Sequence, residues 1–599
     1  MSDLNSMVRL LGPRFGVLAE SNTSQLTVVC RNADVAVGDL FLLPSRRGAD
    51  RIYVFRATQY ANVMNRTLEV GDVARNKLTM PDSYLAEDLA EEQLIELRGM
   101  VLGYAEHSVA SDEWAFHRPR RLPQHLTDVF LVQHQAPHMA DVMRTLLGRQ
   151  LGEGLFVGEL LAGEAALSGV RVCIPTFALS HHIGVFGRTG SGKSNLMMVL
   201  LSSILDWNHR CWQGTVVGPP ASIFAIDPHD EFRTWHATSG GRDGIRGIVQ
   251  GYSDDERAAL VAPLYYLSAK DLGTESLEQR IRLSRADVTP QDFISVMEFS
   301  EQQVAFANQF YAREGERWVA KLLLGDTGPA DGAGEGNAEF LPGTVSAVQR
   351  RLGFLRRGNT RVFTAFDAEA GAPYDSSLPD ILCALEAGRV LVVDTTLMSE
   401  LEQFLVTTVV ARVLFCLRKA LRSAENAERL EHEIRTALSN DDAQGQVGMR
   451  SLADELVQRL QSGALPYLQD GRLRAASELP FVNVVIEEAP SILNPDRLRF
   501  GSIFRDISRQ GRKFGIGLTV VSQQVSAIDA GVLTQTNTEL IMGLGNENER
   551  REAIRNASAD LAGFERELQV MGRGQLLVTG SYNDVPLPVQ VPNFDQMGE

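Results

Sequence analysis

The sequence predicts an α/β protein with a small β-rich region at its N-terminus. From residue 170 onward, strongly apolar segments that end in polar residues alternate with helical segments. This alternation is typical of a parallel sheet covered on both faces. Within residues 1–100, short β-branched or aromatic segments are separated by Gly, Asn and Asp, which favours a small barrel or sandwich.

The strands expected in these two parts are short and well separated. In the β-rich region they read GVLAES, QLTVVCR, DLFLLPSR, RIYVFRAT and RGMVLGYAE. In the α/β part they are residues 182–187, 222–227, 263–268, 389–394, 481–488 and 515–524.

The composition is that of a soluble globular protein with more than one domain. The chain has 599 residues, of which 44% are hydrophobic and 22% are charged, and a single core rarely grows beyond about 250–300 residues. The five cysteines are scattered without a C-x-x-C pair, so neither a disulfide framework nor a zinc cluster is expected. We therefore expect a reducing, cytoplasmic location.

Neither a signal peptide nor a membrane span is expected. The N-terminal segment lacks an apolar run followed by a small-residue cleavage site. The most apolar helical segment, residues 404–417, contains Arg412 and is shorter than the roughly 20 residues that span a bilayer, so we expect a buried helix there. The net charge of −17 argues against a protein coated in nucleic acid, but leaves room for a small basic patch.

A phosphate-binding loop is predicted early in the α/β part. Residues 187–194 read GRTGSGKS and fit the pattern G-x-x-x-x-G-K-[ST]. The apolar segment IGVF precedes them and the helical segment SNLMMVLLSSIL follows, which is the context that this motif requires. Backbone N–H groups of such a loop bind phosphate at a helix N-terminus. The predicted ATP-binding residues are Gly187, Thr189, Gly190, Ser191, Gly192, Lys193, Ser194 and Asn195.

ATP and Mg²⁺ are therefore the expected substrate and cofactor. Lys193 would reach the β- and γ-phosphates, and the Ser194 hydroxyl would bind Mg²⁺. The apolar segment VNVVI ends in Glu487 and Glu488. We expect Glu487 to be an outer-shell magnesium ligand and Glu488 to be the general base that polarises the attacking water. This pair favours ATP hydrolysis; the alternative is that both are solvated acids at a helix cap.

Further polar residues follow the acidic pair. Gln523, at the end of GIGLTVVSQQ, would lie beside the γ-phosphate in an additional-strand ATPase; the alternative is an exposed glutamine in a turn. The intervening FRDISRQGRKFG contains Arg505, Arg509, Arg512 and Lys513. Arg512, with Arg509 as the second choice, is the predicted arginine finger that acts on a neighbouring subunit's ATP. The alternative is that these cations stabilise a helix C-terminus.

The segment AIDPHDEF places Asp227, His229, Asp230 and Glu231 after another apolar strand. Strand C-termini in open α/β sheets face the ligand crevice. Asp227, His229 and Glu231 are therefore candidates for coupling the ATP state to substrate. The alternatives are an independent metal site and plain capping of the loop.

Motifs in this order resemble the HerA branch of the HerA–FtsK superfamily of ring-shaped DNA translocases. They are GRTGSGKSN, AIDPHDEF, VVIEEAPSIL, GRKFGIGLTVVSQQ and LTQTNTELIMGLGNENER. The resemblance spans residues 150–595, and the N-terminal β region is similar to the small barrel of HerA proteins. Glu487 stands where most families have Asp, Asp230 where the family often has Gly, and Pro490 where His is common. A role copied from that histidine therefore has no support here.

The resemblance implies a RecA-like P-loop ATPase core of the additional-strand type. It implies a homohexamer with ATP sites between subunits and double-stranded DNA in a central pore. It also implies a separate partner, either a NurA-like nuclease or a nuclease-like or sirtuin-like effector in anti-phage defence. Lys193, Ser194, Glu487, Glu488 and Gln523 carry over by motif position.

The expected domain organisation follows from these motifs. Residues 242–257 are a candidate pore loop for DNA. The expected domains are an N-terminal barrel (1–115), a linker and entry to the ATPase domain (116–169), a first core part with the phosphate loop (170–270), a helical insertion (271–385), a second core part (386–580) and a C-terminal tail (581–599).

The main functional prediction is a hexameric, ATP-driven translocase or helicase of double-stranded DNA that serves a nuclease or defence effector. The alternative is an ATP-dependent assembly scaffold, or a protein remodeller, that activates a partner with little DNA translocation. A conjugation-type coupling ATPase is a further alternative, for which a membrane anchor is expected.

Overall fold

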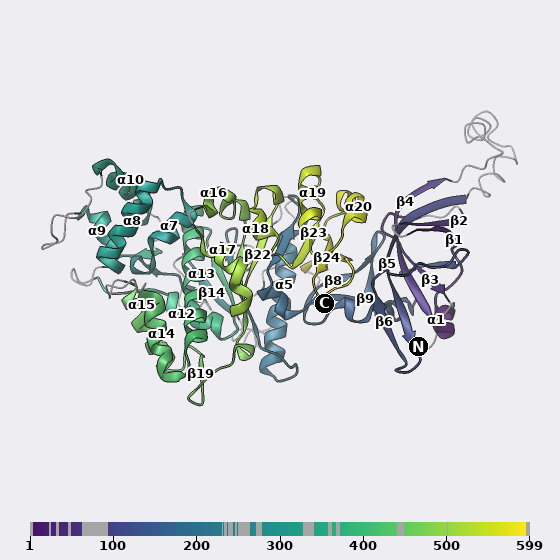
Figure 1. The fold of residues 1–599 in the computed structure, drawn as a ribbon, viewed down its shortest axis with the longest axis horizontal. Helices are drawn as coiled ribbons and strands as arrows, with labels where there is room; N and C mark the ends of the chain where they lie inside the picture. Colours follow the sequence, from purple (N-terminus) through teal and green to yellow (C-terminus); the bar gives the residue numbers. More distant parts are fainter. Residues whose placement is uncertain are drawn as a thin grey trace. The chain divides into compact units, whose positions relative to one another are not determined.

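The computed structural model describes residues 4–22, 25–31, 35–45, 50–62, 94–230, 232, 236–237, 244–245, 248, 264–270, 278–327, 341–357, 362–366, 372–439, 448–499 and 501–594 (Figure 1). Contacts between residues divide the chain into two compact units. The first comprises Met1–Pro175, Phe186–Val199 and Asn537–Asn593, and the second comprises Thr176–Val185, Leu200–Thr536 and Phe594–Glu599. Within the described part of the chain, no helix is long and apolar enough to cross a membrane.

The N-terminal part of the first unit is a closed β-barrel, as predicted. Leu18, Val28, Phe41, Phe55 and Leu97 belong to its buried core, because alternate side chains of each strand point inward. Pairing of β2 with β5 closes the ring. The ring runs in the order β2 (Leu26–Arg31), β1 (Gly16–Ser21), β7 (Asp128–Leu131), β3 (Leu40–Ser45), β4 (Arg51–Asn62) and β5 (Leu94–Ser108), and β6 (Glu113–His117) pairs with β5 outside it.

The barrel extends beyond the predicted boundary at residue 115, because β7 lies between β1 and β3. Without β7, both of these strands would present an unpaired edge. The sequence analysis did not predict β7, a strand of only four residues that follows the polar segment HRPRRLPQH.

Antiparallel strands complete the first unit, in the order β23-β24-β25-β8-β9. The sequence analysis did not predict them, and β8 and part of β9 fall in the range expected to be a linker. In β9, buried and exposed residues are mixed, as in sheets with one solvated face. The bounds are β8 (Leu155–Ala162), β9 (Ala165–Ile174), β23 (Thr538–Met542), β24 (Gln575–Gly580) and β25 (Leu587–Gln590).

A buried ion pair joins the barrel to α20 (Glu565–Val570) within the first unit. Arg56 of β4 donates from Nε to Glu567 Oε2 at 2.8 Å and from Nη2 to Glu567 Oε1. Both side chains are buried. The paired geometry satisfies the carboxylate, and loss of either partner would leave a buried charge uncompensated.

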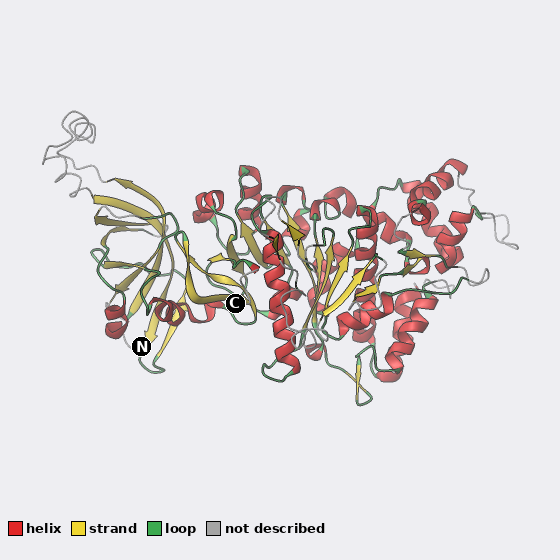
Figure 2. Ribbon diagram, turned by 180° about the vertical axis from the view of Figure 1, so that it is seen from behind, coloured by secondary structure: helices red, strands yellow, loops and turns green. Residues whose placement is uncertain are grey.

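The second unit is built on a parallel sheet. The strands from β14 to β22 pair in parallel in the order β14-β18-β11-β21-β22, and β10 follows β22 in the sheet. α12 packs against β11 and β18, and α17 packs against β22. Figure 2 shows helices beside the strands of this sheet. The bounds are β10 (Ile183–Phe186), β11 (Ala221–Asp227), β14 (Leu264–Ser268), β18 (Val390–Asp394), β21 (Phe481–Ile486), β22 (Ile516–Ser522), α12 (Leu378–Glu386) and α17 (Ile503–Gln510).

This order confirms the predicted additional-strand core. β22 lies between β10, which precedes the phosphate loop, and β21, which precedes the acidic pair. All of the strands expected in the α/β part are present. Every residue of β11, β18 and β22 is buried, as expected for a sheet covered on both faces. Helix α5 (Lys193–Trp212) follows the phosphate loop in the chain.

The predicted helical insertion follows β14 and precedes β18 in the chain. Arg412 of α13 binds both carboxylate oxygens of buried Asp292 in α7, at 2.7 and 2.9 Å, and so anchors the insertion. The apolar segment 404–417 lies in α13 and is mostly buried, as expected. The Gly-rich segment 325–337 lies mostly outside the described residues. The main helices of the insertion are α7 (Pro290–Val296), α8 (Glu301–Glu314), α9 (Trp318–Leu324) and α10 (Pro342–Leu352), whereas α13 (Glu400–Ser423), α14 (Ala427–Ser439) and α15 (Arg450–Gln461) follow β18.

Buried hydrogen bonds position the segment that precedes β10. Asn483 of β21 donates to Leu179 O at 2.7 Å and accepts from the Thr519 hydroxyl of β22 at 2.6 Å. His182 Nδ1 accepts the Leu518 N–H at 3.0 Å. A buried group left without its partner costs about 1–3 kcal/mol. These contacts therefore fix the entry to β10 against β21 and β22.

We expect His182 to make the stability depend on pH. Burial lowers the pKa of His182 to about 4, against about 6.5 in an unfolded chain. Between these values the unfolded chain binds a proton and the folded protein does not. The free energy of unfolding therefore falls as the pH is lowered through this window, by up to about 3 kcal/mol.

The variant His182→Asn tests this expectation. Asparagine retains an acceptor for the Leu518 N–H, and it tolerates the φ of 61° at this position. Urea titrations at about pH 5 and about pH 7.5 should show a weaker loss of stability in acid for the variant than for the wild type. Equal losses would contradict the assignment.

Candidate nucleotide-binding and hydrolysis site

The phosphate loop connects β10 to α5. Gly190 and Gly192 have φ values of 75° and 105°, which glycine adopts without strain. The Lys193 ammonium donates to the carbonyl oxygens of Gly187 at 2.8 Å and Arg188 at 3.1 Å. The lysine charge and the N-terminus of α5 therefore both favour an anionic ligand at this loop.

The start of the loop is packed tightly against β23 and the residue after it, in the same unit. The Arg188 N–H donates to Gly543 O at 3.1 Å. A Cβ added to Gly187 would lie 2.7 Å from Ser191 Oγ and 2.9 Å from Met542 Cβ. Only glycine fits this position, which gives the first glycine of the motif a packing role as well as a phosphate-binding one.

Two later segments of the same unit also hold the loop. The Gly574 N–H donates to Ser191 O at 2.8 Å, and the Asn195 amide donates to Pro592 O at 2.9 Å. The Asn195 side chain therefore supports the start of α5. Its predicted contact with ATP, like that of Ser191, stays a prediction.

The residues of the loop fit a nucleotide phosphate and Mg²⁺. Glycines leave the backbone N–H groups accessible, and the Thr189 and Ser194 side chains are exposed. A hydroxyl oxygen is a hard donor of the kind that Mg²⁺ prefers. With ATP bound, Lys193 would bind phosphate oxygens in place of the loop carbonyls, and Ser194 would hold the ion.

The acidic pair follows β21 in the second unit. Glu487 is partly exposed and Glu488 is exposed. Glu488 has φ 49° and ψ 43°, a left-handed conformation that costs a non-glycine residue about 1–2 kcal/mol. Such strain clusters at active sites, where the surrounding structure holds a side chain in a required direction. The conformation of Glu488 therefore supports a functional role for this residue.

Gln523 lies at the same edge of the sheet as the acidic pair. β21 and β22 are parallel neighbours, and Gln523 follows β22 as Glu487 follows β21. The Gln523 side chain is partly buried, and the Gln524 N–H donates to Ser522 Oγ at 2.9 Å, which shapes the turn. The structure thus brings Gln523 and both glutamates to one edge; their catalytic roles stay predictions.

Asp227 ends β11 at this edge. Its carboxylate is buried and accepts the Phe232 N–H at 2.9 Å, which is the loop-capping role that the sequence left open. His229 is exposed, and Glu231 lies outside the described residues. Among the residues that the structure describes, no group of His, Cys, Asp and Glu could hold a metal ion.

A charged cluster that was not predicted from the sequence lies at the same edge. The Lys270 ammonium lies 2.9 Å from Asp394 Oδ2 and 3.0 Å from Asp230 Oδ2, and the Ser268 hydroxyl donates to Asp394 at 2.7 Å. Burial raises the pKa of Asp394, but hydrogen bonds from Thr396, Lys270 and Ser268 outweigh it and hold that pKa below its usual value. The signal in the sequence is that RVLVVD and PLYYLS both end in a polar residue.

The arginine-rich segment forms α17 and the turn that follows it. Arg509 and Arg512 are exposed, whereas Arg505 is partly buried and donates to a backbone carbonyl at 3.4 Å. Burial lowers the pKa of His181, and the charge of Arg512 lowers it further, so Arg512 lies near the segment that precedes β10. The predicted pore loop, 242–257, falls outside the described residues except for 244–245 and 248.

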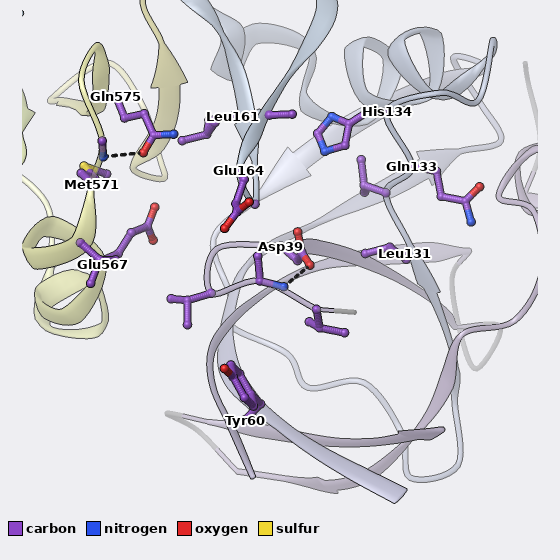
Figure 3. Close-up of a pocket in the computed structure, with 18 of the residues that line it drawn as sticks. Asp39, Tyr60, Leu131, Gln133, His134, Leu161, Glu164, Glu567, Met571 and Gln575 are labelled. Atoms are coloured by element: carbon purple, nitrogen blue, oxygen red, sulfur yellow. Dashed lines mark hydrogen bonds between the residues drawn. The ribbon is translucent and has the colours of Figure 1, made fainter. Parts of the chain in front are cut away.

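The first unit also contains a cavity of about 1090 Å³ (Figure 3). Barrel residues, including the acidic Asp39, line one side, and the segment 571–575 contributes to another. Glu164 and Glu567 add two further acidic groups to the lining. The residues that line this cavity include none of the predicted site residues, so it is separate from the predicted chemistry.

Residues 155–337 match the family model described as "Helicase HerA, central domain". Over 479 residues, the chain is 23% identical to the DNA double-strand break repair helicase HerA of Pyrococcus furiosus, covering 76% of this chain and 72% of that protein. Over 472 residues, it is 28% identical to the protein of the same name from Sulfurisphaera tokodaii, covering 78% and 76%. These matches support an ATPase that is similar to the HerA-type ATPases of the HerA–FtsK superfamily.

Solved structures similar to this chain include VirB4 of Thermoanaerobacter pseudethanolicus and the bacterial conjugative coupling protein TrwB. For VirB4, the identity is 13% and the TM-score is 0.36, over 74% of this chain and 97% of that one. For TrwB, the identity is 11% and the TM-score is 0.41, over 70% and 87%.

Two departures of this chain from the HerA pattern, Asp230 and Pro490, have local explanations. Asp230 has φ 56°, which accounts for the glycine that HerA proteins often have there, and its carboxylate is used by Lys270. Pro490 lies in the 3-10 turn after Glu488, where its fixed φ suits the first turn of a helix. Its carbonyl accepts from the Asn494 side chain at 2.8 Å.

The strain at Glu488 predicts an unusual order of stabilities. Glycine relieves the left-handed conformation and alanine does not, so Glu488→Gly should be more stable than Glu488→Ala by about 1 kcal/mol. Gln458, exposed within α15, gives the matched control, because glycine is the less stable residue in a helix. Urea unfolding should therefore rank Gly above Ala at 488 and Ala above Gly at 458. If glycine and alanine rank in the same order at both positions, the backbone at Glu488 is not strained.

Proposed function

We propose that this chain is a HerA-type, ATP-driven translocase of double-stranded DNA. It acts in the cytoplasm as a homohexamer, with DNA in a central pore and ATP sites between subunits. It moves DNA for a separate partner, either a NurA-like nuclease or a nuclease-like or sirtuin-like effector in antiviral defence. The observation that carries the proposal is the strained Glu488 beside the strand end that bears Gln523. The relatives named as DNA double-strand break repair helicases support DNA as the object that is moved.

The proposed reaction is attack of water on the γ-phosphate of ATP, which gives ADP and phosphate. Glu488 accepts the proton of the attacking water, Lys193 binds the β- and γ-phosphates, and Gln523 orients the water or senses the γ-phosphate. Ser194, with Glu487 in the outer shell, would hold Mg²⁺, which would neutralise charge on the phosphates.

Movement requires that the nucleotide state reach the DNA. β11, β18 and β14 are parallel neighbours, and Lys270 joins Asp230, after β11, to Asp394, at the end of β18. This cluster lies at the same edge as Glu488 and ties three strand ends together. We assign coupling to this cluster, to Asp227 at the end of β11, and to His229 and Glu231, which follow β11 in the chain.

Two variants test the hydrolytic site. Lys193→Ala should lose ATP binding and hydrolysis. Glu488→Gln should lose about 10²–10⁴-fold in hydrolysis rate, because the base is missing, and should still bind ATP. Phosphate release is measured with magnesium, with and without linear duplex DNA, for the wild type and both variants. Glu425→Gln, an exposed carboxylate in a loop, is the matched control and should behave as the wild type.

Stimulation of the wild type by DNA, lost in Glu488→Gln, supports a DNA motor. If DNA does not change the rate of hydrolysis, and if Glu488→Gln still activates the partner, the assembly scaffold or the protein remodeller is favoured. If Glu488→Gln hydrolyses ATP at the wild-type rate, Glu488 is not the general base.

The arginine finger is tested by mixing variants. Arg512→Ala should bind ATP but lose about 10³-fold or more in hydrolysis. Lys193→Ala subunits retain Arg512 and lack a working loop, so mixing them with Arg512→Ala subunits should restore part of the activity. Lys513→Ala, the exposed neighbour, is the control. If mixing restores no activity, Arg512 does not act on the ATP of a neighbouring subunit. If Arg512→Ala is fully active, Arg509 becomes the candidate for the arginine finger.

A further inference from the structure

A tight turn in the first unit carries an exposed arginine that the proposed mechanism does not use. Residues 572–575 read GRGQ. The Gln575 N–H donates to Gly572 O at 3.3 Å, and Gly574, the third residue, has φ 76°, as in a type II turn. Gln575 Oε1 accepts the Gly572 N–H at 2.8 Å, which is a second hydrogen bond between the first and last residues of the turn (Figure 3). Side-chain and backbone hydrogen bonds thus hold the same turn.

The turn is attached to the phosphate loop. The Gly574 N–H donates to Ser191 O at 2.8 Å. A Cβ added to Gly192 would lie 3.4 Å from Gly574 N and 3.6 Å from Gly574 Cα, so the two backbones are in close contact. On its other side, Gly574 O accepts the Val591 N–H at 2.8 Å. The turn therefore has one position relative to the loop.

Arg573 is the second residue of this turn. Its Cα lies about 3.8 Å from that of Gly574, which touches the loop, and its side chain is exposed. Among the described residues, the structure shows no ion pair of Arg573. A guanidinium is a planar, permanently charged fork of donors that matches phosphate oxygens. The turn thus carries a phosphate-binding group beside the phosphate loop.

We propose that Arg573 binds the α- or β-phosphate of the nucleotide held by the phosphate loop of its own chain. Its anchor is Ser191, in the part of the loop whose backbone cradles the α- and β-phosphates, whereas Lys193 serves the β- and γ-phosphates. ATP and ADP share the α- and β-phosphates, so Arg573 strengthens the binding of both nucleotides by the same factor. This role differs from that of Arg512, which acts in trans on hydrolysis.

The inference rests on nucleotide binding by the phosphate loop, which Lys193→Ala tests separately. The probe is a fluorescent ADP analogue, titrated into the full-length chain. ATP is measured by competition in the Glu488→Gln background, where hydrolysis does not interfere. Arg573→Ala should weaken both nucleotides about tenfold, as expected for a charge-assisted hydrogen bond. Arg573→Lys should recover part of the affinity through its charge. Arg566→Ala, an exposed arginine in α20, should bind as the wild type.

Hydrolysis separates binding from catalysis. Arg573→Ala should raise KM for ATP about tenfold with little change in kcat, because the contact is made equally in the ground state and the transition state. Alanine is tolerated at the second position of a type II turn, so the unfolding temperature should not change.

A second variant tests whether the turn positions the arginine. In Gly574→Ala, the added Cβ lies 2.8 Å from Gln590 Nε2 and the backbone φ disfavours alanine, so the turn should shift while Arg573 is kept. Weaker binding of both nucleotides by this variant supports the inference.

Three results would overturn the inference. If Arg573→Ala binds ADP as tightly as the wild type while Lys193→Ala loses binding, Arg573 does not contact the nucleotide, and the proposed function is unaffected. A weaker affinity for ATP alone places Arg573 at the γ-phosphate. A fall in kcat without a change in KM makes it a catalytic group. Retained binding by Lys193→Ala, in contrast, counts against the proposed function itself.

Discussion

The buried hydrogen bonds between the segment 176–182 and the strands β21 and β22 are the constraint on which the sheet of the second unit depends. Asn483 lies within an otherwise apolar strand, and both ends of its amide are used, one by Leu179 and one by Thr519. His182 binds the backbone of β22 in the same layer. A shift of register by one residue would leave these groups buried and unpaired. Apolar packing alone would tolerate several registers; these polar contacts select one.

That register decides which residues stand at the carboxyl edge. Because every position of β11, β18 and β22 is buried, these strands offer polar chemistry only where they end. Asp227, Asp394 and Gln523 all lie at or just after such an end. Two non-glycine residues with positive φ, Asp230 and Glu488, follow strands of the same sheet. Backbone strain is thus present at the edge where charged groups gather, as is common where function requires a side-chain direction that the backbone does not prefer.

The phosphate loop has a different kind of support. Its own residues are contiguous, but the groups that hold it come from the far end of the chain: Gly543, Gly574 and Pro592. The loop has few side chains of its own to pack, because glycines keep its backbone accessible to phosphate. The C-terminal strands therefore supply the rigidity that the glycines remove. The same support brings the turn 572–575 to the nucleotide-binding loop.

What the sequence by itself determined is what depends on neighbouring residues. The phosphate loop is recognisable because its glycines, Lys193 and Ser194 follow one another between a strand and a helix. The buried strands of the core and the first strands of the barrel are recognisable because each is a continuous or alternating run of β-branched and aromatic residues. The acidic pair is recognisable because it directly follows such a run.

Only the tertiary structure decided what depends on residues far apart. β7 is too short to be a strand by its own pattern, and its pairing with β1 and β3 makes it one. Lys270 has an ordinary sequence context, and its two aspartates come from other strands. Gly574 meets Ser191 because antiparallel strands of the same unit bring the end of the chain back to its phosphate loop. A hydrogen bond or an ion pair between distant segments leaves no periodic signal in either segment, so these contacts are visible only once the chain has folded.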